Sequence, residues 1–202
     1  MTAIGAVLCD LDGVLRLWDA RLLNDLDLAH GLPVGTLAAA AFAPIRLVPA
    51  LTGEHTDEQW RAAVTEALTK TCGAERAKAL VTDWTAATGR VDDTVAALLR
   101  RARAEVPVVL LTNATTRLES DLADLGLTDL PTAVVSSARV GFAKPDPRVY
   151  TIAADRAGVP APRCLFVDDT AANIDPARAA GMTTLLYRHP RQLEEALAPL
   201  LT

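Results

Sequence analysis

Short apolar runs alternate with stretches of helical periodicity along most of this chain. Runs of this length that are bounded by polar or glycine-containing turns predict β-strands. The runs that fit are residues 4–9, 106–111, 133–135, 164–167 and 183–187. Helical patterns at 115–125, 147–157 and 171–180 lie between the later runs, and each is followed at once by a glycine, the usual stop of a helix. Strand–helix–strand spacing of this kind predicts right-handed crossovers, and hence an α/β fold with a Rossmann-like parallel sheet of about five strands flanked by helices.

The long interval between the first two predicted strands contains no convincing strand. It carries helical runs at 20–30 and after Pro33, and then a proline-containing loop at 43–55. Two strong helices follow. Thr56 and Gln59 form a capping box that opens the first, and the second spans 75–88.

This pattern predicts a division of the chain into two parts. Residues 1–16 and 90–202 are expected to form the Rossmann-like core domain, and residues 17–89 a small all-helical cap domain inserted after strand 1. An insert at the carboxyl end of a strand lies over the crevice where open α/β sheets bind ligands. The cap is therefore expected to serve as a lid.

Composition narrows the class of protein. With 202 residues, the chain is long enough for one domain with a sizeable core and a small insert. A net charge of −5 argues against a nucleic-acid partner, because phosphate backbones are bound by clustered Lys and Arg. The N-terminus has no basic lead-in and only a short apolar stretch, so neither a signal peptide nor a membrane span is expected. Three widely separated cysteines without a C-x-x-C pair argue against zinc-ribbon sites, and a reduced, cytoplasmic location is expected.

Polar residues stand at the ends of four predicted strands or just before the helices that follow. They are Asp10 and Asp12, Thr112 and Asn113, Lys144, and Asp168 and Asp169. Because the carboxyl ends of parallel strands share one edge of a sheet, these side chains are expected to meet there.

Each of these sites alone also has a purely structural explanation. D-L-D-G could be a turn, and it fails as a calcium loop because Leu15 and Arg21 stand where an EF-hand needs Gly and Glu. Asp146 followed by a proline reads as a helix N-cap, which would leave Lys144 on the surface. The paired aspartates and the Thr-Asn pair could likewise be only caps and turns.

The combination of sites points to chemistry. Like charges about 4 Å apart cost on the order of 1 to 4 kcal/mol per pair, so crowded carboxylates need a cation. Lys144 supplies one, and oxygen ligands without nearby His or Cys indicate Mg²⁺ as another. A carboxylate kept protonated by its like-charged neighbours could then act as a general acid.

The segments D-L-D-G-V-L, L-L-T-N, G-F-A-K-P-D-P-R-V-Y and F-V-D-D-T-A-A-N, in this order, resemble the four motifs of the haloacid dehalogenase superfamily. The last motif and its continuation are similar to the phosphatase domain of soluble epoxide hydrolases and to sugar-phosphate phosphatases. The cap segment T-G-E-H-T-D-E-Q-W is similar to the helical cap of that subgroup. No epoxide hydrolase domain is expected, since the chain ends soon after the fifth strand.

This resemblance implies a role for each residue. Asp10 would be the nucleophile that forms an aspartyl-phosphate, and Asp12 would protonate the leaving oxygen and later take a proton from water. Thr112, Asn113 and Lys144 would bind the phosphoryl group. Mg²⁺ would be held by Asp10, the backbone carbonyl of Asp12, and Asp168, with Asp169 and Asn173 as direct or indirect supports. Cap residues and the turn after Asp12 would choose the substrate, and Arg16, Trp18, Arg46 and His55 are the candidates in predicted loops.

The expected function is a Mg²⁺-dependent phosphatase acting on a small phosphorylated metabolite. A 2-haloacid dehalogenase shares the fold and nucleophile, but the second aspartate and the D-D pair count against it. A phosphosugar mutase stays possible, as does a non-catalytic protein that binds a phosphorylated ligand. The sequence leaves the substrate and the oligomeric state open.

Overall fold

The computed structural model describes residues 3–201, and its centre is a five-stranded parallel sheet. The strand order is β5-β4-β1-β6-β7, and each neighbouring pair is parallel. The strands are β1 (Ala6–Cys9), β4 (Val108–Thr112), β5 (Ala133–Ser136), β6 (Cys164–Asp168) and β7 (Thr183–Leu186). This confirms the expected α/β fold class and places each predicted strand within a few residues.

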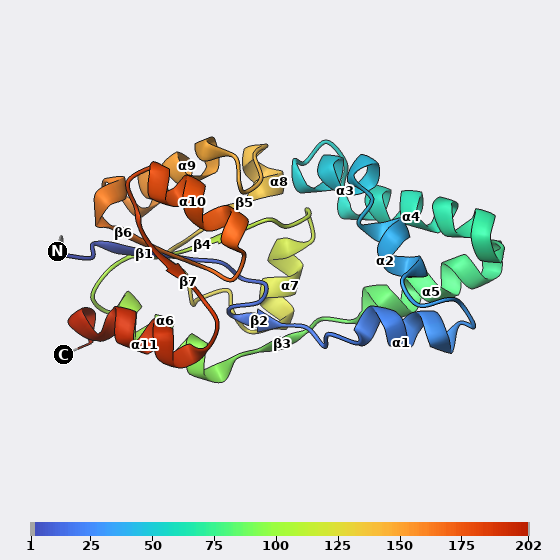
Figure 1. Ribbon diagram of the computed structural model, residues 1–202, viewed down its shortest axis with the longest axis horizontal. Coiled ribbons are helices and arrows are strands. Elements are labelled where there is room, and N and C mark those ends of the chain that lie inside the picture. The colour runs from blue at the N-terminus through green and yellow to red at the C-terminus, as the bar shows by residue number, and fades with distance from the viewer. Residues whose placement is uncertain (1–2, 202) are drawn as a thin grey trace.

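Helices cover both faces of this sheet (Figure 1). Ala6 and Leu8 pack on one face with α9 (Pro147–Ala157) and α10 (Ala171–Ala179). The alternate residues of β1, Val7 and Cys9, pack on the other face with α6 (Asp93–Arg103) and α11 (Pro190–Leu197). All four residues of β1 are fully buried. The first charged residue is Asp10, which directly follows the strand.

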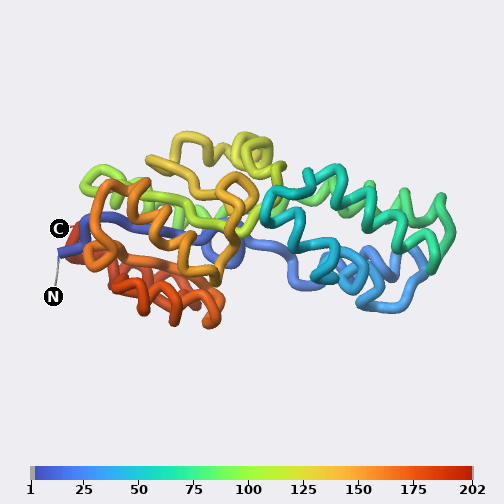
Figure 2. Tube along the Cα trace, turned by 90° about the horizontal axis from the view of Figure 1, so that it is seen from above, coloured from blue at the N-terminus to red at the C-terminus, as the bar shows by residue number. Residues whose placement is uncertain are grey.

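Five further helices form a separate body beside the sheet, called the cap below (Figures 1 and 2). They are α1 (Leu22–Ala29), α2 (Thr36–Ala41), α3 (Pro44–Leu51), α4 (Asp57–Cys72) and α5 (Ala74–Ala86). The cap has its own hydrophobic cluster, in which Trp60 and Trp84 meet edge to face with ring centroids 5.1 Å apart. The predicted capping box of Thr56 and Gln59 is present at the start of α4.

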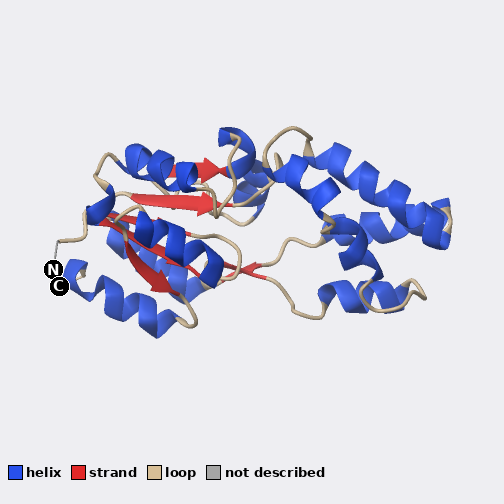
Figure 3. Cartoon of the chain, turned by 45° about the horizontal axis from the view of Figure 1, so that its top comes forward, coloured by secondary structure: helices blue, strands red, loops and turns tan. Residues whose placement is uncertain are grey.

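The chain enters and leaves the cap through a short antiparallel ribbon that the sequence pattern did not predict. It pairs β2 (Arg16–Leu17) with β3 (Arg90–Val91), and it crosses between the two parts of the molecule (Figure 3). Two-residue strands are too short to give an alternating pattern.

The prediction of a loop at 43–55 was wrong over much of its length, because α3 occupies Pro44–Leu51. Pro44 stands at the first turn, where the missing N–H costs nothing, whereas Pro49 lies inside the helix. Leu47 and Ala50 pack into the cap cluster, and this burial offsets the hydrogen bond lost at Pro49.

The helix expected at 115–125 is shorter, α7 (Leu118–Asp124). Thr115 and Thr116, which were expected to begin this helix, bind the cap instead. The Thr115 hydroxyl donates to Asp57 Oδ1 at 2.7 Å, and the Thr116 hydroxyl accepts from the Asp57 N–H at 2.9 Å. Near it lies the short helix α8 (Ser137–Val140). Two 3-10 turns complete the fold, η1 (Ala161–Arg163) and η2 (Ala198–Leu200).

Gly53, just beyond α3, touches the core domain. It has φ +77°, and a Cβ there would collide with the backbone oxygen of Ala138 in α8. The cap thus contacts the core at this glycine and at the start of α4. Over residues 3–201, no helix combines the length and hydropathy that crossing a membrane requires.

Candidate active site

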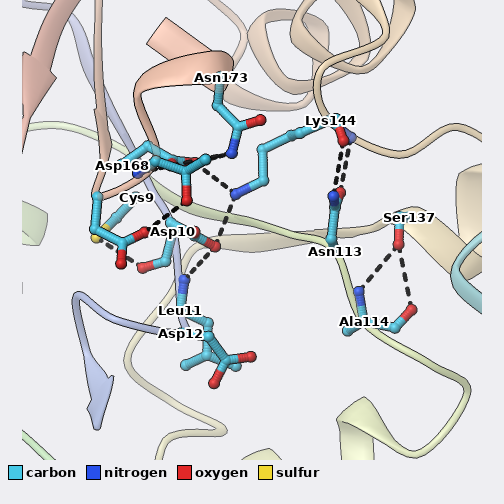
Figure 4. A network of polar contacts seen from close by, with 12 residues as sticks. Cys9, Asp10, Leu11, Asp12, Asn113, Ala114, Ser137, Lys144, Asp168 and Asn173 are labelled. Atoms are coloured by element: carbon cyan, nitrogen blue, oxygen red, sulfur yellow. Dashed lines mark hydrogen bonds and ion pairs between the residues drawn. The ribbon is translucent and has the colours of Figure 1, made fainter. Parts of the chain in front are cut away.

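Three charged side chains from distant segments meet at the carboxyl edge of the sheet (Figure 4). Lys144 Nζ lies 2.8 Å from Asp10 Oδ1 and 2.7 Å from Asp168 Oδ2. Asp10 follows β1, Asp168 ends β6, and Lys144 lies in the loop before α9. All three are buried, so Lys144 is not a surface lysine.

Asn113 positions the backbone of Lys144. Its side-chain amide donates to the Lys144 carbonyl at 2.8 Å, and its Oδ1 accepts from the Lys144 N–H at 2.7 Å. The family resemblance seen in the sequence implies that Asn113 binds the phosphoryl group. In the structure its amide fixes the loop that carries the lysine, and one of its two amide hydrogens is used for this.

Asp168 is held from three sides. Its carboxylate accepts from the Thr170 N–H at 2.8 Å and from the Asn173 amide at 3.0 and 3.1 Å, and it pairs with Lys144. The backbone of Asn173 is fixed as well, because its backbone carbonyl accepts from the Tyr150 hydroxyl at 2.8 Å. These neighbours therefore hold the Asp168 carboxylate in a fixed orientation at the sheet edge.

The environment of Asp10 disfavours its charge. Burial raises the pKa of this carboxyl, Lys144 lowers it and the nearby Asp168 charge raises it, and together they bring the pKa to about 7. Asp10 Oδ1 accepts from the Leu11 N–H at 2.7 Å and pairs with Lys144, whereas Oδ2 has no hydrogen bond within residues 3–201. Ionised Asp10 would be favoured by a second cation, and Oδ2 is the oxygen free to react.

Asp10, Asp168 and Asp169 can each offer an oxygen within 4.8 Å of the others. Three carboxylates at this spacing fit a hard divalent cation such as Mg²⁺. Gly13 lets Asp169 approach, because it has φ +81° and a Cβ there would collide with the Asp169 carboxylate. The Asp12 side chain is not part of this group.

Asp12 points to the turn that follows it instead. Its carboxylate accepts two bonds from the Arg16 guanidinium, at 2.6 and 2.9 Å, and one from the Trp18 indole N–H at 2.6 Å. Arg16 is 5% exposed and also donates to Asp121 of α7 at 2.8 Å. Sequence reasoning named Arg16 and Trp18 as specificity candidates but missed Asp121, which no local pattern links to Asp12.

Thr112, the last residue of β4, carries a buried hydroxyl without a hydrogen-bond partner in the described part of the chain. Leaving such a group unpaired costs roughly 1–3 kcal/mol. Ser136, which faces Thr112 in the register of β5, has the same feature. Both hydroxyls thus have a hydrogen bond left to donate within the described part of the chain.

A cavity of about 510 Å³ lies between the cap and the core and reaches the site. Asp12 and Asn113 form part of its wall on the core side, and α3, α4 and α5 contribute from the cap. Of the specificity candidates, Arg16 and Trp18 line this cavity. Arg46 instead donates to the backbone of α2, and His55 is exposed.

A model of haloacid dehalogenase-like hydrolases matches residues 4–181 of this chain. The chain belongs to this family. A 98-residue segment of this haloacid dehalogenase-like hydrolase is 37% identical to Phosphatase MT3486 of Mycobacterium tuberculosis (strain CDC 1551 / Oshkosh), covering 48% of this chain and 45% of that protein. A 55-residue segment is 38% identical to Bifunctional epoxide hydrolase 2 of Sus scrofa, covering 27% of this chain and 10% of that protein. The matched segments thus span less than half the length of these two relatives.

Solved structures share the fold of this haloacid dehalogenase-like hydrolase. The HAD family enzyme bt-2542 of Bacteroides thetaiotaomicron, in complex with magnesium and inorganic phosphate, has a TM-score of 0.75 at 19% identity and covers 92% of this chain and 95% of its own. An L-2-haloacid dehalogenase from Xanthobacter autotrophicus with chloropropionic acid covalently bound has a TM-score of 0.64 at 21% identity, covering 97% and 83%. At these identities the likeness shows the fold alone.

Proposed function

We propose that this hydrolase is a Mg²⁺-dependent phosphatase that cleaves a small phosphomonoester through an aspartyl-phosphate on Asp10. The observation that carries the proposal is the buried Asp10 at the end of β1, paired with Lys144 and adjoining a group of carboxylates that fits a divalent cation. The likeness to Phosphatase MT3486 supports it. The predicted cytoplasmic location and the predicted lack of nucleic-acid and membrane partners stay predictions.

The reaction would proceed in two displacements. Asp10 Oδ2 forms a bond to phosphorus as the bond to the leaving oxygen breaks, and Asp12 gives that oxygen a proton. Asp12 then takes a proton from water, whose oxygen attacks phosphorus and frees Asp10 and inorganic phosphate. Arg16 and Trp18 hold the Asp12 carboxyl at the cavity wall between these steps.

The phosphoryl group would be bound by side chains at the strand ends. The unpaired Thr112 hydroxyl donates to a phosphoryl oxygen, and the Lys144 ammonium offsets its charge. Asn113 holds Lys144 in place and has a second amide hydrogen to donate. We infer that Asp10, Asp168 and Asp169, with the backbone carbonyl of Asp12, hold Mg²⁺. When bound, the ion neutralises charge on the phosphate and on Asp10.

A 2-haloacid dehalogenase is the second candidate, because dehalogenases share this fold. Carboxylate attack on a carbon bearing halide needs no metal, and its leaving group takes no proton. Three clustered carboxylates and the paired Asp12 have no use in that reaction. A phosphosugar mutase would use the same residues and is separated from a phosphatase by whether phosphate is released.

The test is phosphate release from p-nitrophenyl phosphate and a panel of sugar phosphates and nucleotides with Mg²⁺. Asp10→Asn should lower the rate at least a thousandfold, because it removes the nucleophile without changing the shape of the side chain. Asp155→Asn, which changes an exposed carboxyl of α9, should leave the rate unchanged.

Chelation by EDTA should abolish the activity, and added Mg²⁺ should restore it. Asp10→Asn activity equal to the parent would refute the nucleophile assignment. Activity that persists in EDTA would refute the metal assignment. A parent protein inactive on the whole panel would refute the phosphatase itself.

A further inference from the structure

The cavity between cap and core is mainly apolar where it leaves the site. Large aromatic side chains from four segments face it: Trp18 from the loop after β2, Phe42 from the end of α2, Trp60 from α4 and Trp84 from α5. Leu47 and Leu51 of α3 extend the same wall. Pockets with such a lining bind ligands largely through burial of apolar surface.

Two of these aromatic residues are unusually open. Trp18 is 40% exposed and Phe42 is 44% exposed, although both are large apolar groups. Phe42 meets Trp84 edge to face, with ring centroids 6.4 Å apart, so it continues the aromatic wall outwards. Apolar surface that is left open inside a cavity is surface that a ligand can cover.

The cations of the cavity are already paired with carboxylates. Arg16 pairs with Asp12 and Asp121, and Arg117 also pairs with Asp121, at 2.8 Å. The remaining guanidinium, from Arg61, pairs with Asp57 at 2.6 Å.

Arg61 also donates to the Thr85 hydroxyl at 2.7 Å and lies over the Trp84 ring at 4.8 Å. The lining as a whole holds these three arginines against four aspartates, Asp19 being the fourth. A second anionic group on a substrate would therefore find no guanidinium in this lining without a carboxylate partner.

We propose that the alcohol part of the substrate is a compact apolar group, aromatic or aliphatic, without a second negative charge. This inference rests on the proposed phosphatase function and adds the substrate class. The phosphoryl group sits at Asp10 and Lys144, and the apolar group lies against Phe42, Leu47 and the two cap tryptophans. Sugar hydroxyls in the same place would lose hydrogen bonds to water without gaining partners on this wall.

The test compares phosphate esters of primary alcohols that differ only in the group the cavity would contact. Cyclohexylmethyl phosphate and glucose 6-phosphate have rings of similar size and the same kind of leaving oxygen. Benzyl phosphate and 4-carboxybenzyl phosphate differ by one charge. We expect kcat/KM to be at least tenfold higher for the first member of each pair. In the first pair, burial of a few ring carbons corresponds to about that factor. In the second pair, the added carboxylate would lose its hydration without gaining an unpaired cation.

Phe42→Ser gives a second readout, because Phe42 is partly exposed and does not touch Asp10 or Asp12. It should lower kcat/KM for cyclohexylmethyl phosphate about tenfold while leaving acetyl phosphate, which is too small to reach the wall, unchanged. Val48→Ser is the matched control: Val48 lies on α3 and is 51% exposed but does not line the cavity.

The possible failures are distinguishable. If glucose 6-phosphate or the carboxylated ester is hydrolysed as well as its apolar partner, or if only acetyl phosphate is hydrolysed, the substrate class is wrong and the phosphatase stands. If no ester and no acetyl phosphate is hydrolysed, the proposed function itself is wrong. An equal loss in Phe42→Ser and Val48→Ser would also overturn the cavity assignment.

Discussion

The surroundings of Asp10 determine the pKa of its carboxyl group. Burial alone would keep this carboxyl neutral, and Lys144 only partly offsets the effect, so the pKa stays at about 7 instead of the usual 3.8. An additional cation beside Asp10 would favour its ionised form, which is the form that can attack phosphorus. The charge of the nucleophile is therefore expected to depend on the metal.

This dependence predicts how metal and pH act on stability. In metal-free protein at pH above about 7, the fold must hold an ionised Asp10, whereas the unfolded chain ionises near pH 3.8. A difference of this size corresponds to about 4 kcal/mol of unfolding free energy, which is fully present below pH 3.8 and is lost progressively as pH rises to 7. In EDTA, the stability of the parent relative to Asp10→Asn should fall as pH rises through this window.

Mg²⁺ should reverse that loss, because the metal favours the ionised carboxylate. The increase in melting temperature caused by Mg²⁺ should be larger at pH 8 than at pH 5.5 in the parent. Asp10→Asn should show a small increase that varies little between these pH values. An increase of the same size at both pH values in the parent would contradict the account of Asp10.

At the scale of elements, the strand ends were the predictable part of the site. Burial of β1, β4 and β6 requires continuous apolar runs, so the first polar residue after each run, such as Asp10, marks the sheet edge. Lys144 was singled out for another reason, because it lies just before a predicted helix, which is α9 in the structure. Parallel strands made it predictable that these residues would converge.

Other contacts depend on how elements pack, and the sequence pattern could not predict them. Nothing local to Arg16 indicates that it reaches Asp121 on α7, 105 positions away. The late start of α7 has the same origin, since Thr115 binds Asp57 across the cap contact. The helix α3 was missed because its two prolines are typical of loops and only burial in the cap offsets their cost.

Arg16 connects two elements of the fold, because it binds both Asp12, in the turn after β1, and Asp121 of α7. This connection can be tested by mutation. Arg16→Lys keeps the charge but loses the planar fork that makes three hydrogen bonds to Asp12 and Asp121. We expect kcat on p-nitrophenyl phosphate to fall at least tenfold with a smaller change in KM, because the proposed role of Asp12 is proton transfer. Steady-state kinetics of Arg16→Lys and of a control variant, Arg139→Lys, checks this.

The control is Arg139→Lys, which changes a surface pair with Glu119 whose side chains are 62% and 55% exposed. Exposed pairs contribute about 0–1 kcal/mol, so neither kcat nor stability should change appreciably. A kcat for Arg16→Lys that matches this control would show that Arg16 does not position Asp12.

At the scale of the whole molecule, cap and core both line a cavity whose wall on the core side includes Asp12 and Asn113. Figure 4 shows these two residues beside the carboxylates at the sheet edge. Contacts at Asp57 and Gly53 fix where α3 and α4 lie against the core. In the proposed mechanism the core supplies the groups for phosphoryl transfer, and the cap supplies the apolar wall. Asp10, and no other residue, carries the phosphoryl group during turnover in this proposed mechanism.

The most direct test of this central claim is mass spectrometry after a single turnover in water labelled with heavy oxygen, with enzyme in excess over p-nitrophenyl phosphate and Mg²⁺ present. Rapid acid quenching should trap the peptide that contains Asp10 with the added mass of one phosphoryl group. After complete turnover, the label should be in the released phosphate and not in that peptide, because water attacks phosphorus. Label in the Asp10 carboxylate, or a phosphoryl group on any other residue, would contradict the account.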